Sequence, residues 1–279
     1  IWVSTFDFSP SGGDIAENVI QNSDTSYVVC GYTFNATEGA TDGVLYSLSL
    51  DSGDTLWYRQ ISVGFNDRFS DVKETSDGGF IISGFRNMTE DSTVFLLKTD
   101  SVGVEEWREF YGSTDYERVT DVEIAEDGGF VIFGDMINTN TATDDFQMIK
   151  TNSTGVEEWS YQYDSPINVN EGGGLGCKTL DGGFIQVGSK ETSSGSGTEE
   201  SVVVKVNSLG VLEWEKEWNL PISRYSLWGV VPNPDSSFVT CGLAINGSDN
   251  PVTWLVKFNQ NGDTVWTRSY SYYDPSVAH

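Results

Sequence analysis

Short runs of apolar residues, either alternating with polar ones or continuous, are separated by Gly, Asp and Asn along the whole chain. In one representative stretch, polar and apolar residues alternate through Asp121–Ile124 and stop at an Asp-Gly-Gly turn. A nearly all-apolar run, Phe130–Phe133, follows and ends at Gly134. Two further runs, Phe146–Lys150 and Val156–Tyr163, come after a polar segment. Alternation with a period of two, aromatic and β-branched content and turn-forming punctuation predict four short strands here.

The same arrangement recurs five times. One marker is an aromatic residue followed four positions later by Gly: Tyr27/Gly31, Phe80/Gly84, Phe130/Gly134, Phe184/Gly188 and Phe238/Gly242. A second marker is Gly-x-x-x-Trp: Gly53/Trp57, Gly103/Trp107, Gly155/Trp159, Gly210/Trp214 and Gly262/Trp266. Successive Trp residues of the second marker are 50, 52, 55 and 52 positions apart. Four antiparallel strands in about 50 residues is the size of a β-propeller blade.

The repeat also predicts how the blades pack. One four-stranded sheet cannot bury both of its faces, so neighbouring sheets must stack against each other. We expect the repeated Trp, Phe and Tyr rings to fill the space between blades rather than to bind ligands. The Asp-Gly-Gly turns supply the positive φ that a tight hairpin requires. No apolar stripe with a 3.6-residue period is sustained, so helix is expected to be nearly absent.

The predicted fold is an all-β β-propeller of four-stranded antiparallel blades, with five full repeats plus one extra N-terminal outer strand. Residues 1–279 are expected to form a single propeller domain, in which residues 1–13 are the last strand of a preceding blade. The five blades are placed at approximately 14–70, 71–120, 121–173, 174–227 and 228–279. The extra strand belongs to a sixth repeat outside this sequence, which we favour, or it pairs with the sheet edge of a neighbouring subunit and builds polymers.

Two segments carry a resemblance to a known family. Leu96–Trp107 and Val203–Trp214 resemble the strand–turn–strand Trp motif of PQQ-like propeller repeats. The Asp-Gly-Gly-Phe turns resemble those of secreted bacterial and archaeal repeat propellers. The resemblance covers almost the whole chain and implies a propeller fold. It does not carry over quinoprotein dehydrogenase activity, because no calcium-binding and cofactor-clamping set can be assigned residue by residue.

Composition and charge exclude several functions. The 279 residues include 15 Lys+Arg and 42 Asp+Glu, which gives a net charge of −27 and argues against nucleic acid as a partner. The single His is the terminal His279, so His-rich metal sites and Ser-His-Asp chemistry are excluded. No apolar run approaches the roughly 20 residues that span a bilayer. An acid-rich surface with few lysines is typical of a secreted or cell-surface protein.

Sequons and cysteines add little to this picture. Candidate N-glycosylation sites occur at four N-x-[S/T] sequons, about as many as chance produces: Asn35, Asn87, Asn152 and Asn246. The three cysteines are expected to be buried thiols, with a Cys177–Cys241 bridge as the alternative: Cys30, Cys177 and Cys241.

A candidate binding rim follows from three arginines at equivalent positions between blades. Its members are the arginines and three nearby aromatic residues: Arg68, Arg118, Arg224, Tyr116, Tyr225 and Trp228. Such a rim would bind an acidic glycan or an acidic peptide. The alternative, which we favour, is a repeated Arg–carboxylate pair that ties blade to blade.

Oxygen-rich hairpins and acidic pairs are the remaining candidates. Asn259–Asp263 and Asp51–Asp54 have the oxygen spacing of a calcium loop, but these residue types also form ordinary turns. No cofactor is therefore expected, with calcium as the alternative. The pairs Glu105/Glu106 and Glu157/Glu158 cannot converge on one substrate, because neighbours along a strand point to opposite faces. They are expected to solvate an outer strand.

The leading functional hypothesis is a non-catalytic extracellular or cell-surface propeller that acts as a structural, adhesive or assembly module, such as a filament or surface-layer component. Its expected partners are proteins or glycans, with self-association included. The alternative is a secreted glycan-binding module, or a calcium- or cofactor-dependent enzyme with its site at the propeller axis. That site would lie on the first strands of the blades, around Asp71, Asp121 and Lys178.

Overall fold

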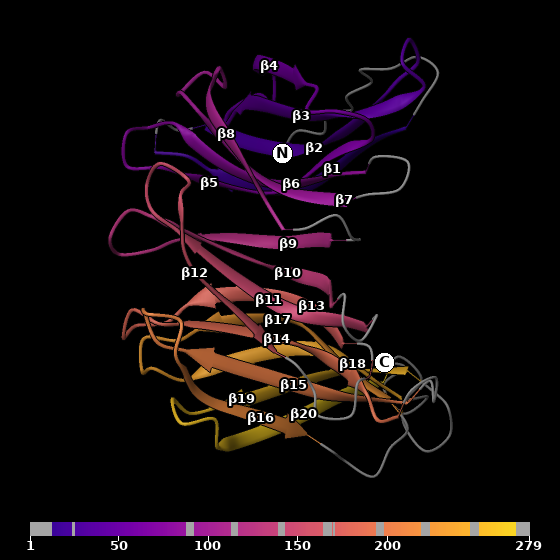
Figure 1. Cartoon of the computed structure of the whole chain (residues 1–279), viewed down its shortest axis with the longest axis vertical. Coiled ribbons are helices and arrows are strands. Elements are labelled where there is room, and N and C mark those ends of the chain that lie inside the picture. Colours follow the sequence, from indigo (N-terminus) through magenta and orange to yellow (C-terminus); the bar gives the residue numbers. More distant parts are fainter. Residues whose placement is uncertain are drawn as a thin grey trace. The chain divides into compact units, whose positions relative to one another are not determined.

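All regular elements in the described part of the chain are β-strands (Figure 1). The computed structural model describes residues 13–23, 26–87, 92–112, 117–138, 143–163, 169, 171–193, 198–218, 224–245 and 251–271. The strands of the first two sets are β1 (Asp14–Gln21), β2 (Ser26–Asn35), β3 (Ala40–Ser49), β4 (Thr55–Ile61), β5 (Asp67–Glu74), β6 (Phe80–Asn87), β7 (Ser92–Thr99) and β8 (Glu105–Tyr111). Those of the remaining three sets are β9 (Glu117–Ile124), β10 (Phe130–Asn138), β11 (Thr143–Thr151), β12 (Glu157–Tyr163), β13 (Glu171–Lys178), β14 (Phe184–Glu191), β15 (Glu199–Val206), β16 (Leu212–Trp218), β17 (Arg224–Pro232), β18 (Phe238–Ile245), β19 (Pro251–Phe258) and β20 (Thr264–Ser271). No helix in these ranges is long and apolar enough to cross a membrane.

Each set of four strands pairs in chain order, as in β1–β2–β3–β4 and β5–β6–β7–β8. One parallel bridge, between Glu199 and Arg224, joins the fourth and fifth sets into an eight-stranded sheet. These five antiparallel blades confirm the predicted fold class. The first strands of the later blades begin a few residues before the sequence-based boundaries. The predicted extra N-terminal strand falls in residues 1–12, outside the described residues.

The Asp-Gly-Gly hairpins form as the sequence predicts. In the third blade, Gly128 has φ +81, and its N–H donates to the carbonyl of Ala125 at 3.1 Å. The Asp127 carboxylate accepts the N–H of Gly129 at 2.8 Å, so the first residue of the motif holds the turn closed. In the fifth blade, Ser236 takes the place of the glycine and still adopts φ +63. The turn geometry therefore persists where the motif has diverged.

The chain forms two compact units, residues 1–132 with 151–157 and residues 133–150 with 158–279. In the first unit, Val28 and Leu45 of the first blade pack against Phe69, Val72 and other apolar residues of the second. In the second unit, the fourth and fifth blades share one buried apolar cluster that includes Val187, Val203 and Phe258. Each unit thus buries its core between successive sheets, as stacked blades require.

The repeated Trp residues contact the next blade in both units. In the first unit, Trp57 lies 6.0 Å from Phe80 and Trp107 lies 6.0 Å from Phe130, measured between ring centroids. In the second unit, the centroids of Trp159 and Phe184 are also 6.0 Å apart. The aromatic rings of the two sequence markers therefore meet across these three junctions, and at the fourth Trp214 meets Phe258 instead.

The glycine of the second marker gives each indole room to pack. A Cβ added to Gly103 would lie 2.8 Å from the Trp57 ring, and one added to Gly210 would lie 2.6 Å from the Trp159 ring. Both glycines also have positive φ, +76 and +75. Gly-x-x-x-Trp therefore serves two junctions, because its Gly receives the indole of the preceding blade while its Trp extends to the following one.

Substitution of Gly210 by Ala is expected to destabilise the protein by about 3 kcal/mol, the sum of positive-φ strain and overlap with Trp159. Gly128→Ala is the matched control, because Gly128 also has positive φ but has no atom within 4 Å of an added Cβ. It should cost only about 1 kcal/mol. Urea unfolding of the two variants measures both values. Equal losses of unfolding free energy in the two variants would show that the Trp159 ring leaves room for a Cβ at position 210.

Candidate functional site

A buried lysine recurs on the third strand of the second, third and fourth blades. Lys98, Lys150 and Lys205 are 5%, 2% and 2% exposed. The ammonium of Lys98 lies 3.0 Å from both Asp77 and Glu106, and that of Lys150 lies 2.7 Å from Glu158. Burial of a charge is costly without partners, so these carboxylates are what allows the lysine to sit there.

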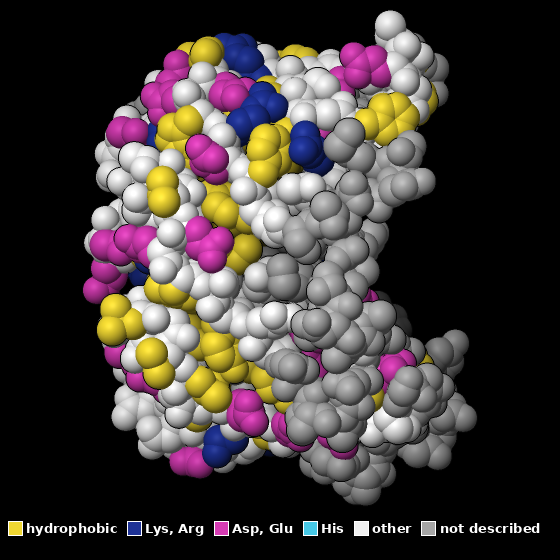
Figure 2. Space-filling model, in the orientation of Figure 1, with side chains coloured by type: hydrophobic (Ala, Val, Ile, Leu, Met, Phe, Trp, Pro, Cys, Tyr) yellow, Lys and Arg dark blue, Asp and Glu magenta, His cyan; other side chains and the backbone are white. Residues whose placement is uncertain are grey.

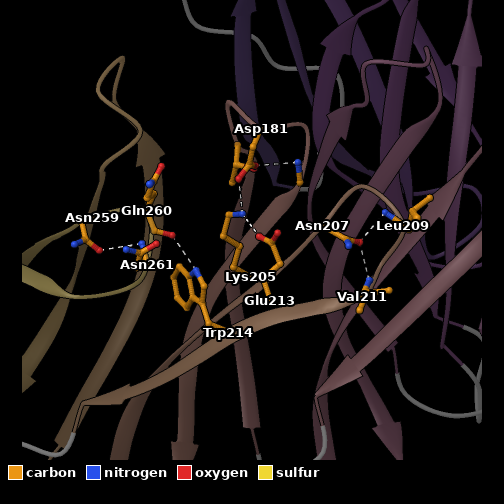
Figure 3. A network of polar contacts seen from close by, with 12 residues as sticks. Asp181, Lys205, Asn207, Leu209, Val211, Glu213, Trp214, Asn259, Gln260 and Asn261 are labelled. Carbon is orange, nitrogen blue, oxygen red and sulfur yellow. Dashed lines mark hydrogen bonds and ion pairs between the residues drawn. The ribbon is translucent and has the colours of Figure 1, made fainter.

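In the fourth blade the same clamp joins Lys205 to Asp181 and Glu213 (Figure 3). The Lys205–Asp181 distance is 2.7 Å. Burial alone lowers the pKa of Lys205, but hydrogen bonds to Asp181 and Glu213 and their charges outweigh it and raise the pKa. Burial acts to raise the pKa of Asp181, and the bonds from Lys205 and Thr179 reverse this and lower it. Lys205 and Asp181 are therefore both charged at neutral pH.

A groove of about 340 Å³ opens above this clamp. It is lined by Asp181, Lys205, Glu213, Trp214, Gln260 and Asn261. The indole Nε1 of Trp214 donates to the carbonyl of Gln260 at 2.9 Å and so fixes one wall against the fifth blade (Figure 3). The Asn259 side chain accepts the N–H of Asn261 at 2.9 Å, which shapes the hairpin of the opposite wall.

A comparable groove of about 300 Å³ occurs in the first unit, between the turns of the second and third blades. Its lining includes Asp77 and Lys98 of one clamp, with Glu126, Phe130 and Ser153 of the next blade. The hydrogen bond from Thr75 and the contacts with Lys98 lower the pKa of Asp77 to about 2. These grooves have fixed carboxylates at the surface over a buried cation, an arrangement that accepts hydrogen bonds and basic groups.

A second polar cluster lies where the first strands of the second and third blades meet. The ammonium of Lys73 is 3.0 Å from Asp71, 3.3 Å from Asp121 and 3.7 Å from Glu123. A β-bulge between Phe69 and Asp71 precedes the cluster, and bulges often re-aim side chains at functional sites. The enzyme hypothesis places a site around Asp71, Asp121 and Lys178. Of these three residues, Asp71 and Asp121 come together within the first unit.

The two aspartates share a buried environment. Asp71 is 1% exposed and Asp121 is 7% exposed. Burial, the hydrogen bond with Asp71 and its charge raise the pKa of Asp121 well above its ordinary value of 3.8. Burial lowers the pKa of Lys73, but the charges of Asp121, Asp71 and Glu123 outweigh it and raise the pKa. The pair therefore retains a proton that a solvated pair would lose.

This cluster is not a feature of every blade. The register position of Asp71, opposite Ser83, is taken by Asn18 in the first blade and by Gly229 in the fifth. Stacking therefore does not require a carboxylate at this position. Among buried residues, a departure from the repeat is a better marker of function than a residue that every blade carries, because repeated buried residues usually serve stacking.

The structure locates part of the predicted arginine rim. Arg68 is exposed, and its guanidinium lies 4.5 Å from the ring centroid of Tyr32 on the preceding blade. Arg118 is exposed on β9. Trp228, 55% exposed, is the extra residue of a bulge in β17 and donates to Ser226 at 3.1 Å. Arg224 and Tyr225 are also in β17, and Tyr116 is outside the described residues. A binding role for the rim stays a prediction.

The sequons have different environments. Asn35 donates its amide to Asp42 at 2.8 Å, and the Asn152 side chain accepts three hydrogen bonds from Thr154 and Val156 in its turn. Asn87 ends β6, and Asn246 is outside the described residues. Glycosylation of any of them stays a prediction.

The cysteine and glutamate expectations need correction. All three cysteines are described and none is in a disulfide, but Cys241 is exposed rather than buried. The side chain of Cys241 is exposed to solvent because its partner on the preceding strand, Gly229, has no side chain to cover it. Glu106 and Glu158 do more than solvate an outer strand, since each pairs with a buried lysine. The lysine clamp was missed, although Lys98, Lys150, Lys205 and Lys257 all stand nine residues before a marker Trp.

The calcium loops behave as turns. The Asn259 side chain accepts backbone N–H groups at 2.9 and 3.0 Å, and Ser52 donates to Asp54 at 2.7 Å. Among the described residues, no three His, Cys, Asp or Glu side chains gather in a way that could hold a metal ion.

Comparisons with known proteins identify the fold. A europium-containing methanol dehydrogenase is similar, with a TM-score of 0.51 and 10% identity over 89% of this chain and 50% of that one. A puromycin-hydrolyzing peptidase of Mycobacterium tuberculosis has a TM-score of 0.54 and 13% identity over 92% of this chain and 38% of that one. The chain thus spans half the length of the first and less of the second. At this identity the likeness shows the fold alone. No family model matches, and no curated protein matches.

The Asp71–Asp121 pair predicts a specific pH dependence. Because the folded state holds a proton on Asp121 that the unfolded chain releases above its ordinary pKa, stability should fall as pH rises from about 4 toward the folded pKa. Asp121→Asn mimics the protonated acid and should remove that part of the slope, leaving the variant more stable than the wild type at pH 7.5. Urea midpoints at pH 4.5, 6 and 7.5 measure it, with Glu157→Gln on β12 as control. Parallel pH profiles for wild type and Asp121→Asn would contradict the shared proton.

Proposed function

We propose that the protein is a non-catalytic binding module that works outside the cell, as a secreted or cell-surface structural, adhesive or assembly component. The observation that carries this proposal is a set of exposed aliphatic side chains on the hairpins that precede the marker Trp residues. In the first unit these are Leu56, Val102, Val104 and Val156, with exposed fractions of 57%, 44%, 50% and 59%. In the second unit, Leu209, Val211 and Val265 are 74%, 58% and 56% exposed.

Repetition makes these exposed residues informative. A single exposed Leu or Val needs no explanation, but the segment between the third strand and the marker Trp carries at least one in every blade, although at positions that differ between blades. Hydrophobic side chains also gather on the face drawn in Figure 2, beside acidic ones. Apolar groups with an acidic surround suit a macromolecular partner that supplies apolar and basic groups.

The rest of the blade supports a scaffold role. The marker Trp, its Gly and the Phe of the turn pack between blades, and the buried lysines pair with the turn carboxylates. Such packing holds the hairpins rigidly, and binding loops on rigid scaffolds lose little entropy on binding. The acidic composition, with 42 Asp+Glu against 15 Lys+Arg, supports the extracellular setting. Proteins, glycans and copies of the same chain are the partners that this surface suits.

A second candidate is an enzyme or ligand-binding site at the Asp71–Lys73–Asp121 cluster. The specific observation is the raised pKa of Asp121 beside a second carboxylate, an arrangement that can give and take protons. Turnover of small hydrolase substrates tests this candidate. Activity that Asp121→Asn abolishes and Glu157→Gln leaves unchanged would support it, and the absence of turnover would count against it.

An adhesion assay tests the leading proposal. Beads coated with the protein should adhere to cells of the organism that produces it, and the triple variant Leu56→Ser, Val104→Ser, Val156→Ser should reduce adhesion at least about fivefold. The control is Ile15→Ser with Val19→Ser, which removes residues that are 45% and 58% exposed on β1, away from the hairpins. Equal adhesion of the triple variant and the wild type would overturn the proposal.

A further inference from the structure

Two turns of the fourth blade carry more exposed aliphatic residues than the corresponding described turns of the other blades. Leu180 is in the Asp-Gly-Gly turn and is 59% exposed, while Leu209, Val211 and Leu212 of the next hairpin are 74%, 58% and 41% exposed. The two turns lie at the same end of paired strands, since Phe184, which follows the first turn, pairs with Val206, which precedes the second. We name these four residues the fourth-blade patch.

The fourth-blade patch adjoins the 340 Å³ groove. Asp181 follows Leu180 directly, and Glu213 follows Leu212. The side chains of Asp181 and Glu213 are 57% and 39% exposed, whereas that of Lys205 between them is 3% exposed. Two carboxylates therefore face solvent over one buried ammonium, and the groove presents a net negative charge.

The carboxylate at the rim is held in place before any ligand arrives. One oxygen of Asp181 accepts from Thr179 and from the N–H of Gly183, and the other accepts from Lys205 at 2.7 Å. On the patch side, the Asn207 side chain accepts the N–H groups of Leu209 at 2.9 Å and Val211 at 3.0 Å (Figure 3). The apolar residues and the acidic groove are thus fixed next to each other, which lowers the cost of binding.

Other blades lack this combination. At the position of Leu180, the second and third blades carry Ser76 and Glu126. In the fifth blade, the hairpin residues that correspond to Leu209 and Val211 are Asn261 and Asp263. The patch is therefore a property of one blade and not of the repeat.

We propose that the fourth-blade patch and its groove bind a protein segment in which aliphatic residues stand next to Lys or Arg. Its aliphatic side chains cover Leu180, Leu209 and Val211, and its basic group pairs with the exposed carboxylates of Asp181 and Glu213. Charge complementarity carries the choice of partner, because both the groove and the whole chain, at −27, are negative. The four patch residues are aliphatic, and the ring of Trp214 in the groove already packs against Phe258. The surface therefore suits a peptide better than a sugar, whose rings stack on aromatic faces. The inference rests on the proposed binding function and names the partner class of one of its sites.

Fluorescence anisotropy with synthetic peptides tests the inference on the full chain. The probe is a labelled 12-residue peptide that alternates Leu and Lys, and the controls alternate Leu with Glu and Ser with Lys. We expect the Leu-Lys peptide to bind at least about tenfold more tightly than either control. Leu209→Ser should weaken binding about tenfold, and so should Asp181→Asn with Glu213→Gln.

Matched variants separate this site from general attraction to an acidic protein. Ile15→Ser removes an exposed aliphatic residue from β1 of the first blade, and Asp51→Asn with Glu157→Gln removes two exposed charges elsewhere. Both controls should change the affinity less than twofold. Equal weakening by the site and control variants, or equal affinity for all three peptides, would overturn the inference.

Glycan-array binding that Leu209→Ser abolishes, without peptide binding, would also overturn the inference but would leave the proposed binding function standing. The proposed function is tested separately by the adhesion assay. If the triple variant Leu56→Ser, Val104→Ser, Val156→Ser adheres to cells as well as the wild type does, the proposed function is wrong.

Discussion

Each described junction between blades depends on an indole ring that contacts a glycine and a phenylalanine of the following blade. Trp159, for example, meets Gly210 and Phe184 in the second unit, and Trp107 meets Gly155 and Phe130 in the first. Only glycine suits this position, for two reasons. Its φ is positive, and a Cβ there would overlap the indole ring of the preceding blade. Close packing of this kind tolerates little change in volume, which explains why both markers recur at a nearly constant spacing.

Sequence patterns predicted the parts of this structure that local rules determine. The strands follow from two-residue alternation, and the hairpins follow from Asp-Gly-Gly, whose φ values at Gly128 and Gly182 are +81 and +79. The packing of Trp57 between blades also follows from the repeat alone. What local rules do not supply is the identity of partners across blades. Arg68 stacks over Tyr32, and Asp71 meets Asp121, through contacts between residues about 36 and 50 positions apart.

The candidate sites differ in how far they could be predicted from the sequence. The lysine clamp has a periodic signal, so Lys205 with Asp181 and Glu213 could have been found from the repeat. The exposure of Cys241 could not, because it depends on the small Gly229 opposite. Charges in this protein consequently divide into two groups. The clamps recur and hold the turns together, while the Asp71–Asp121 pair departs from the repeat. The fourth-blade patch is uncharged and also departs from the repeat, and its proposed partner would pair with the carboxylates of one clamp.

A double-mutant cycle between Trp159→Leu and Gly210→Ala tests the packing between blades most directly. If the indole and the glycine are in contact, removal of the ring makes room for the alanine, and the two losses of unfolding free energy should fall short of additivity by more than about 1 kcal/mol. Losses that add to within about 0.3 kcal/mol would show that the two residues act independently, and the account of how these blades are joined would be wrong.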